Sequence, residues 1–255
     1  LIMTKRKNIV DGREVKKLID DYGLIYTCNA GWIDLGHLNP KNARPEIGAA
    51  NLWKNILKEG KAVLKTECKR IFFKPDECEK DPEYRFPDGS TGFRLRYRQD
   101  HERWPFRPGR EGVYIVKHGL SKHQKKRVAL AIFKEVSYRF ENFQLRFRLI
   151  TDSGYSQDDL VSNLIGFYIG IKEVQRLDIL KRCHPVSKES ALAIWDRDGA
   201  VGKNKNRKWT PRLAKDILIS SKTACEVECL YQPKKFPAVL QRIQPAYKGN
   251  LFVEI

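Results

Sequence analysis

The chain has 255 residues, of which 49 are Lys or Arg and 31 are Asp or Glu, so its formal net charge is +18. Hydrophobic residues account for 41% of the sequence and aromatic residues for 11%, which excludes a disordered basic tail and predicts a globular protein with an anionic partner. No stretch approaches the roughly 18 uninterrupted apolar residues of a membrane span, and no apolar signal core follows the basic residues near the start. We therefore expect neither a membrane span nor a secretory signal.

Hydrophobic periodicity predicts a single α+β domain over residues 1–255, predominantly helical, with a small antiparallel sheet. In chain order, the expected parts are a helical layer at 12–60, a strand-rich insertion at 62–118, central helices at 121–182 and a basic C-terminal part at 183–255. Within these parts, short helices are expected at 12–22, 29–38, 46–59, 188–195 and 211–220, and a loop at 74–92.

The clearest strand pattern covers residues 93–98, where apolar and basic side chains alternate. The alternating residues are Phe93, Arg94, Leu95, Arg96, Tyr97 and Arg98. This pattern predicts one buried face and one face that carries a ladder of arginines.

Two longer helices have stronger start signals. Ser121 is expected to cap the first, whose apolar residues recur at helical spacing from Ala129 to Phe140. The second begins with an acidic capping box at 156–159. One line of this helix carries Asp159, Asn163, Gly166 and Gly170. The two glycines allow another backbone to approach closely, so Asp159 and Asn163 are expected to face the same neighbour.

The densest group of reactive side chains lies within residues 26–38. If the segment after Asn29 is helical, Asp34 and His37 share one face, where the carboxylate could orient the imidazole or both could bind one divalent cation. Cys28 would then lie at the helix N-terminus, which favours a nucleophilic thiolate, although roughly 13 Å of helix would separate it from His37. The alternative is structural, with Asn29 as a cap, a buried Cys28 and a hydrogen bond between Asp34 and His37.

A second group comprises Ser137, Glu141 and Gln144, which share one face if the first long helix continues past Phe140. Glu141 lies beside the apolar stripe, so burial would raise its pKa towards the range of a general acid. A solvated Glu near a fraying helix end is the commoner alternative for such a position.

A third group, Asp158, Asp159 and Asn163, is explained more simply by capping and packing, with Asp159 kept as a substrate-binding candidate. No metalloprotease, phosphate-loop or dinucleotide motif is present, so nucleotide-dependent chemistry is not expected. The six cysteines predict structural thiols or one or two disulfides, ahead of a structural zinc site.

Three blocks of the sequence resemble, in order, those of an uncharacterised family of bacterial envelope-associated proteins. The blocks are YTCNAGWIDLGH at 26–37, SYRFENFQ at 137–144, which contains Glu141, and YSQDDLVSNLIG at 155–166. The family is similar in having a Thr-Cys-x-x-Gly-aromatic-Ile-Asp-x-x-His block, a later Glu and a Ser-x-Glu-Asp-Leu-x-Ser-Asn-Leu block. The resemblance implies that Asp34, His37 and Glu141 meet in one site, and it assigns no activity to that site.

Acidic groups, an imidazole and a thiol or a metal ion are usual components of hydrolytic sites. The first hypothesis is therefore a hydrolase of the bacterial envelope that cleaves glycosidic or amide bonds of peptidoglycan, a choice that the spacing leaves open. In it Glu141 is the general acid, Asp34 and His37 position water or a divalent metal ion, and Cys28 serves an amidase version. The expected substrate-binding residues are Asp159, Asn163, Ser137, Gln144, Arg94 and Arg96.

The positive charge would hold such an enzyme on anionic wall polymers. A secreted antibacterial toxin of this kind would need an acidic inhibitor in the producing cell. It would reach the periplasm or the medium by signal-independent export, and the cytoplasm of the producer is the alternative location.

The second hypothesis is a nucleic-acid-binding protein or nuclease. The arginine ladder and the basic run at 203–208 would contact phosphates, and Tyr97, Trp104 or Trp209 would stack on bases. Against it, no nucleic-acid-binding motif is present, and the polar cluster is expected to lie outside the most basic segments. The third hypothesis is a non-catalytic binding module, for which replacing Glu141 would leave function intact.

Overall fold

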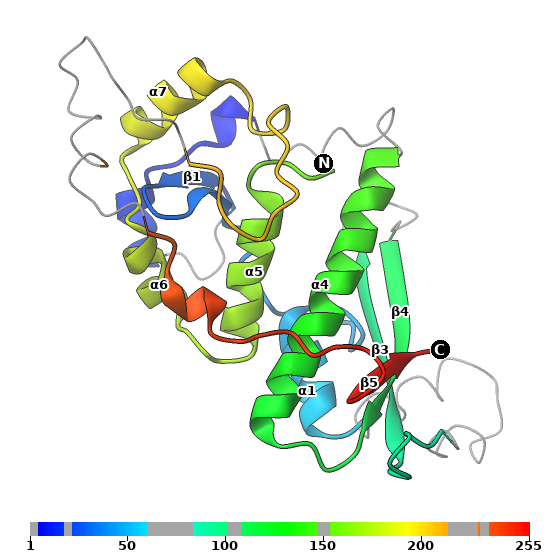
Figure 1. Ribbon diagram of the computed structural model, residues 1–255. Coiled ribbons are helices and arrows are strands. Elements are labelled where there is room, and N and C mark those ends of the chain that lie inside the picture. The colour runs from blue at the N-terminus through cyan, green and yellow to red at the C-terminus, as the bar shows by residue number, and fades with distance from the viewer. Residues whose placement is uncertain are drawn as a thin grey trace. The chain divides into compact units, whose positions relative to one another are not determined.

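The computed structural model describes residues 5–17, 22–60, 84–100, 109–146, 154–213, 229 and 235–255 (Figure 1). Its helices and small antiparallel sheets confirm the predicted α+β class. The chain forms two compact units: the first unit comprises 1–39 and 141–242, and the second unit comprises 40–140 and 243–255. Within the described part of the chain, none of the helices combines the length and apolar character that crossing a bilayer requires.

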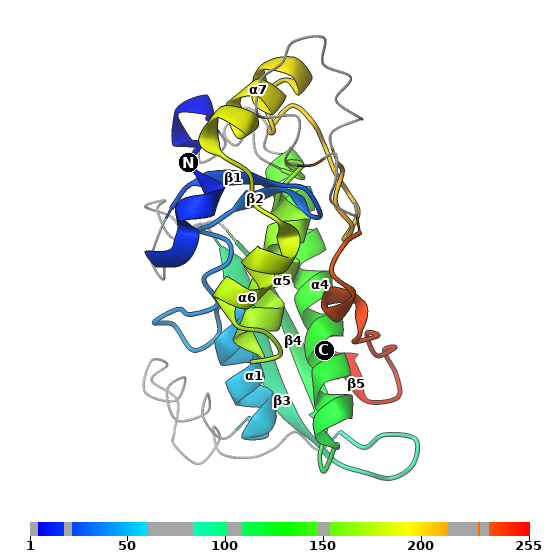
Figure 2. The ribbon, with the colours of Figure 1, turned by 90° about the vertical axis from the view of Figure 1, so that its left-hand side faces the viewer.

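The second unit is built on a three-stranded antiparallel sheet (Figure 2). Its strands, in sheet order, are β3 (Gly92–Asp100), β4 (Gly109–Lys117) and β5 (Phe252–Glu254). Its helices are α1 (Ala49–Leu57) and residues 122–140 of α4 (Lys122–Arg146). The ring centroids of Tyr97 and Phe133 lie 6.2 Å apart, which packs α4 against the apolar face of β3.

The strongest predictions from the sequence fall in this unit. Ser121 forms a complete capping box with Gln124, whose N–H donates to the Ser121 Oγ at 3.2 Å while its Oε1 accepts from the Ser121 N–H at 2.9 Å. Helix α4 continues past Phe140, as expected. The apolar residues of β3 are buried and its arginines lie on the opposite face, so the predicted alternation is confirmed.

The first unit surrounds a two-stranded hairpin of β1 (Leu24–Thr27) and β2 (Gly31–Asp34). Its helices are α5 (Asp159–Gly170), α6 (Arg176–Cys183) and α7 (Lys188–Asp198), with short 3-10 turns η1 (Arg6–Asn8), η2 (Gly12–Lys17) and η3 (Ala238–Gln241). Edge-to-face contacts of Trp32 with Tyr26 and with Trp195 join the hairpin to α7 in one apolar core.

The helix expected at 29–38 is wrong, because Gly31–Asp34 is a strand. Residues 28–30 form a three-residue hairpin loop, and Gly31 after it has a positive φ of 66°, the conformation that such a loop requires. Helices at 46–59 and 188–195 are confirmed as α1 and α7, whereas the helix at 12–22 is reduced to η2 in the described residues. The expectations for 62–83 and for most of 211–220 lie outside the described residues.

Candidate functional site

The site begins at the end of strand β2. The Asp34 Oδ1 accepts the Gly36 N–H at 2.8 Å, and the Asp34 carbonyl accepts the His37 N–H at 3.2 Å. These two bonds close a tight turn that holds His37 beside Asp34. Asp34 and His37 are thus neighbours in the fold, but a turn and not a helix brings them together, and the Asp34 carboxylate binds the Gly36 N–H.

Helix α5 packs against this turn. An ideal Cβ on Gly166 would lie only 2.5 Å from the His37 carbonyl oxygen, so no larger residue fits without a shift of the turn. The Ser162 Oγ accepts the Asp34 N–H at 3.0 Å. The close backbone approach predicted for Gly166 is confirmed, and the neighbour is the turn that carries His37.

Glu141 enters the same region from the last turns of α4. Its side chain is buried, as the sequence analysis expected, and the whole residue is only 2% exposed. Its Oε2 accepts the backbone N–H of Tyr155 at 2.8 Å. The chain passes very close to α4 just before Tyr155, since an ideal Cβ on Gly154 would lie 2.8 Å from the Glu141 carbonyl oxygen. Glu141 is therefore held in one orientation by the start of the segment that leads into α5.

Asp159 lies next to Glu141, and their carboxyl groups form a hydrogen bond. The Asp159 Oδ2 also accepts the Ser156 N–H at 2.6 Å, which is the acidic half of the predicted capping box. The Asp159 Oδ1 lies 3.9 Å from the Nδ1 of His37. Asp159 thus links Glu141 to His37, a closer role than the substrate-binding one expected from the sequence.

Asp158 is the site residue whose importance the sequence analysis missed. It stands at the N-cap of α5 but makes no capping bond. It is fully buried, and neither carboxyl oxygen accepts a hydrogen bond from another residue that the structure describes, although its own backbone N–H lies near enough to favour the charged form. The available signal was the pair of adjacent acidic residues at 158–159, because one acidic residue is enough for the capping box.

The ionisable groups of this cluster perturb one another. Burial and, less strongly, the nearby charge of Asp34 raise the pKa of Asp158 to about 7, while His37 opposes the shift. Burial also raises the pKa values of Glu141 and Asp159. Burial lowers the pKa of His37, but the charges of Asp34, Asp158 and Glu141 together outweigh it, so the net shift is upward.

Solvent reaches these groups unequally. The His37 side chain is 40% exposed, whereas the Asp159 side chain is 7% exposed and Asp158 has no accessible surface. His37 is thus the member of the cluster that a molecule in solution can touch most readily. The carboxyl groups lie behind it.

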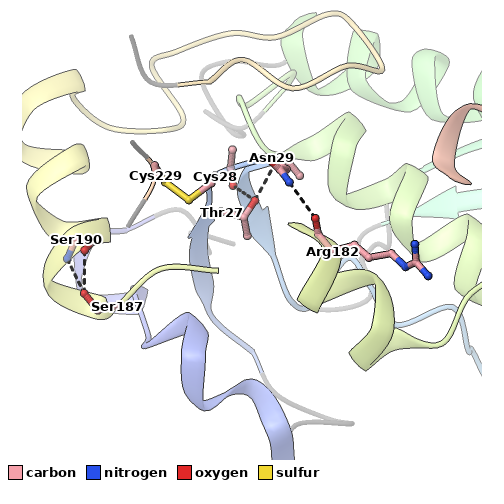
Figure 3. Close-up of a disulfide and its surroundings, with 9 residues drawn as sticks. Thr27, Cys28, Asn29, Arg182, Ser187, Ser190 and Cys229 are labelled. Carbon is pink, nitrogen blue, oxygen red and sulfur yellow. Dashed lines mark hydrogen bonds between the residues drawn. A yellow bond between two sulfur atoms is a disulfide. The ribbon is translucent and has the colours of Figure 1, made fainter. Parts of the chain in front are cut away.

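Cys28 is not available as the predicted nucleophile, because its Sγ forms a disulfide with Cys229 (Figure 3). The bond joins positions 201 residues apart and fixes Cys229 to the hairpin that carries Asp34. Of the other cysteines in the described residues, Cys183 is a free buried thiol whose pKa burial raises to about 12. The helix N-terminus proposed for Cys28 is absent, since Thr27 ends a strand.

The remaining candidates do not all gather here. Asn163 is half-buried on α5, and Gln144 is buried on the last turn of α4. Ser137 accepts a hydrogen bond from the Nε2 of Gln99 at 2.8 Å, so its contact is with the sheet of the second unit. Arg94 and Arg96 lie on strand β3 of that unit, where Arg96 is ion-paired with Glu111 at 3.3 Å.

Among the residues that the structure describes, no group of three or more His, Cys, Asp or Glu side chains is arranged to hold a metal ion. Comparisons with protein-family models, curated proteins and solved structures found no match. The site therefore has to be interpreted from its own geometry and charge.

Proposed function

We propose that the protein is a hydrolase of the bacterial envelope that acts on peptidoglycan, with His37 as the group that exchanges protons with substrate and water. The observation that carries the proposal is a partly exposed imidazole beside buried carboxyl groups, with the His37 Nδ1 3.9 Å from the Asp159 Oδ1. Such a base, oriented by an acidic partner, is the usual arrangement for hydrolytic proton transfer.

The charges around His37 suit this role. Asp34, Asp158 and Glu141 favour the imidazolium form, so the pKa of His37 rises from an ordinary value that is already near neutrality. A histidine in this range can accept a proton from an attacking water and return it to the departing oxygen or nitrogen. The water thereby adds its oxygen to the substrate, one proton passes through the imidazole, and His37 ends each cycle unchanged.

Glu141 is assigned a positioning role in place of the general-acid role expected from the sequence. Because it is 2% exposed and is bound to both the Tyr155 N–H and the Asp159 carboxyl, we assign it as a positioning residue. Its charge stabilises the imidazolium through Asp159, and its hydrogen bonds hold Asp159 in place. The general-acid step proposed for Glu141 from the sequence passes to the exposed His37.

Peptidoglycan remains the proposed substrate for three reasons. The net charge of +18 draws the chain to anionic wall polymers. The blocks at 26–37 and 155–166, which resemble those of an envelope-associated family, are the segments that build the site. The Cys28–Cys229 disulfide is compatible with an oxidising compartment outside the cytoplasm. An antibacterial toxin reaching the periplasm, with an acidic inhibitor in its producer, is consistent with this reading.

The nucleic-acid alternative draws less support from the arginine ladder and none from Tyr97, and it keeps the basic run at 203–208. Arg96 and Arg98 are ion-paired with Glu111 and Asp100, so the ladder is not a free row of phosphate contacts. Tyr97 is 1% exposed and cannot stack on a base.

The test is incubation of purified sacculi with the full chain, followed by mass spectrometry of the released fragments. Glu141→Gln keeps an acceptor for the Tyr155 N–H and should lower kcat roughly 10²–10⁴-fold. It should also move the acid limb of the pH–rate profile to lower pH, because the lost charge no longer raises the pKa of His37. Glu189→Gln, an exposed change on α7, is the matched control.

The masses of the fragments identify the bond, and a parallel sample with chelator tests the predicted divalent metal ion. No release of fragments by the unmodified protein would contradict the proposal. Equal release by the Glu141→Gln protein would contradict the assigned site.

A further inference from the structure

A strongly basic loop borders the acidic cluster. This basic loop, residues 199–212, contains five basic residues and no acidic one: Lys203, Lys205, Arg207, Lys208 and Arg212. The sequence analysis expected the polar cluster to lie outside the most basic segments. The cluster residues do lie outside this loop in the sequence, but in the fold the loop packs directly on residues 155–157, beside the cluster.

Backbone contacts fix this arrangement. The Asn206 N–H donates to the Tyr155 carbonyl at 3.0 Å, and Lys205 forms an antiparallel bridge with Ser156. The Gln157 Nε2 donates to the Arg212 carbonyl at 2.7 Å. The N–H groups of Tyr155 and Ser156 also donate to the Glu141 and Asp159 carboxyl groups. The basic loop and the acidic cluster are therefore attached to the same two residues.

The loop also has a defined internal shape. The buried Asn206 donates from its Nδ2 to the Thr210 carbonyl at 3.0 Å and accepts the Lys208 N–H on its Oδ1 at 3.0 Å. The side-chain bonds of Asn206 and the contacts with residues 155–157 hold the loop backbone in one conformation, so its side chains have defined positions.

Its cations project towards the site and towards solvent. The Arg207 guanidinium lies over the ring of Tyr155, with its central carbon 5.3 Å from the ring centroid, and the residue is exposed. Lys205 lies close enough to Glu141 for its charge to oppose the rise that burial causes in the pKa of Glu141. Lys203 and Lys208 are exposed. Cations therefore flank the acidic cluster on the side of Tyr155.

We propose that the basic loop binds a carboxylate of the peptide stem of peptidoglycan and thereby holds the scissile bond at His37. The proposal rests on the proposed hydrolase function and deepens it. Peptide stems carry free carboxylates, and an arginine with a neighbouring lysine is suited to grip a carboxylate. A chitin strand, which lacks both lactyl groups and peptides, offers no carboxylate, so the loop selects carboxylate-bearing wall substrate over neutral glycan.

The short span of the loop favours this substrate over nucleic acid. Its five cations occur within ten residues, which matches one or two anionic groups better than the extended groove that tracks a phosphate backbone. Tyr155, the aromatic ring beside Arg207, is 2% exposed and is unavailable for stacking on a base.

The experiment measures binding separately from cleavage. The double variant Lys205→Gln and Arg207→Gln removes the two cations nearest the cluster, and Lys7→Gln with Lys181→Gln is a control of equal charge change on exposed residues. Three substrates are compared: intact sacculi, sacculi whose carboxylates have been amidated, and insoluble chitin as a neutral glycan. Binding is measured by co-sedimentation in the Glu141→Gln background, and kcat and KM in the otherwise unmodified protein.

We expect the loop variant to bind intact sacculi about 10-fold more weakly than the control, with the loss in KM and not in kcat. Amidated sacculi and chitin should bind the unmodified loop about as weakly, and the loop variant should show no further loss on them. Equal binding of intact and amidated sacculi, or full activity of the loop variant, would overturn the proposal while leaving the hydrolase standing.

Loop-dependent binding without any released fragment would instead contradict the hydrolase and support the loop. Tighter, loop-dependent binding to single-stranded nucleic acid at the same ionic strength would overturn the carboxylate proposal in favour of phosphate recognition.

Discussion

Two aspartates with fully buried side chains, Asp100 and Asp158, show opposite ways to keep a carboxyl group away from water. Asp100 accepts two hydrogen bonds from the Arg44 guanidinium, at 2.7 and 2.8 Å, and a third from Arg98 at 3.2 Å. Asp158 accepts no hydrogen bond from another described residue and faces the charges of Asp34 and Glu141. Both side chains have no accessible surface.

The difference in hydrogen-bond partners distinguishes a structural carboxyl group from a candidate functional one. A buried carboxylate with a bidentate arginine is satisfied, and it fastens the segment of Arg44 to strand β3. A buried carboxyl without a partner lowers stability when ionised, so a protein retains it where the charge has a use. Burial alone does not indicate a functional site, whereas a buried carboxyl that no other side chain binds is a candidate for one.

Breaking the satisfied carboxyl should cause the largest loss of stability. Asp100→Asn replaces the carboxylate that binds both Arg44 and Arg98 with a neutral amide, and both arginines are largely buried, so we expect a loss of about 3 kcal/mol in the free energy of unfolding. Urea denaturation at pH 7 measures it. The matched control is Glu111→Gln, which weakens the half-exposed ion pair between Glu111 and Arg96 in the same sheet. It should lower the free energy of unfolding by less than about 1 kcal/mol. A similar cost for both variants would contradict the distinction.

Removing the Asp158 carboxyl should raise the free energy of unfolding at high pH, whereas removing the Asp100 carboxyl lowers it. The pKa of Asp158 is about 7 in the folded protein and lower in the unfolded chain, so the folded state binds the extra proton between about pH 4 and 7. Its contribution to stability is complete below the unfolded pKa and is lost as the pH rises through 7. Asp158→Asn carries no charge, so we expect it to be more stable than the parent at pH 8, by up to about 4 kcal/mol, and progressively less so towards pH 5.

Urea denaturation at pH 5 and pH 8 tests this sign. Asp178→Asn, an exposed change on α6, is the control and should follow the parent at both pH values. A variant at Asp158 that is less stable than the parent at pH 8 would mean that the carboxylate has a stabilising partner.

Local signals were sufficient where the chain itself contains the cause. The Ser121 cap with its apolar stripe predicted α4, the alternation at 93–98 predicted β3, and the position of Glu141 beside the stripe predicted its burial. Each depends on side chains a few residues apart, whose geometry follows from helix or strand periodicity.

Long-range pairings could not be predicted in this way. Arg98 is neutralised by Asp100 and lies opposite Glu111 on β4, and the disulfide joins Cys28 to a residue 201 positions away. A cysteine count does not give connectivity, and an arginine ladder does not reveal the acidic residues of the next strand. The hairpin at 24–34 was missed for another reason, since a polar cluster with spacing i, i+3 is compatible with a helix and with a strand that ends in a turn.

The smallest expected effect concerns Gly166, which the sequence indicated and the structure explains. In a free helix Ala would be more favourable than Gly by about 1 kcal/mol. Here the added Cβ would lie 2.5 Å from the His37 carbonyl oxygen, so the turn must move. We expect Gly166→Ala to lower stability by about 1 kcal/mol or slightly more, and to shift the pKa of His37 back towards its ordinary value as the imidazole leaves the carboxyl groups. An NMR titration of the His37 ring measures that shift.

Ser162→Ala is the comparison, because it removes only the bond to the Asp34 N–H and leaves the His37 carbonyl free of any clash. If Gly166→Ala left the titration of His37 unchanged, the close packing of α5 would serve the fold alone. A shifted titration would show that the same contact sets the charge of the imidazole.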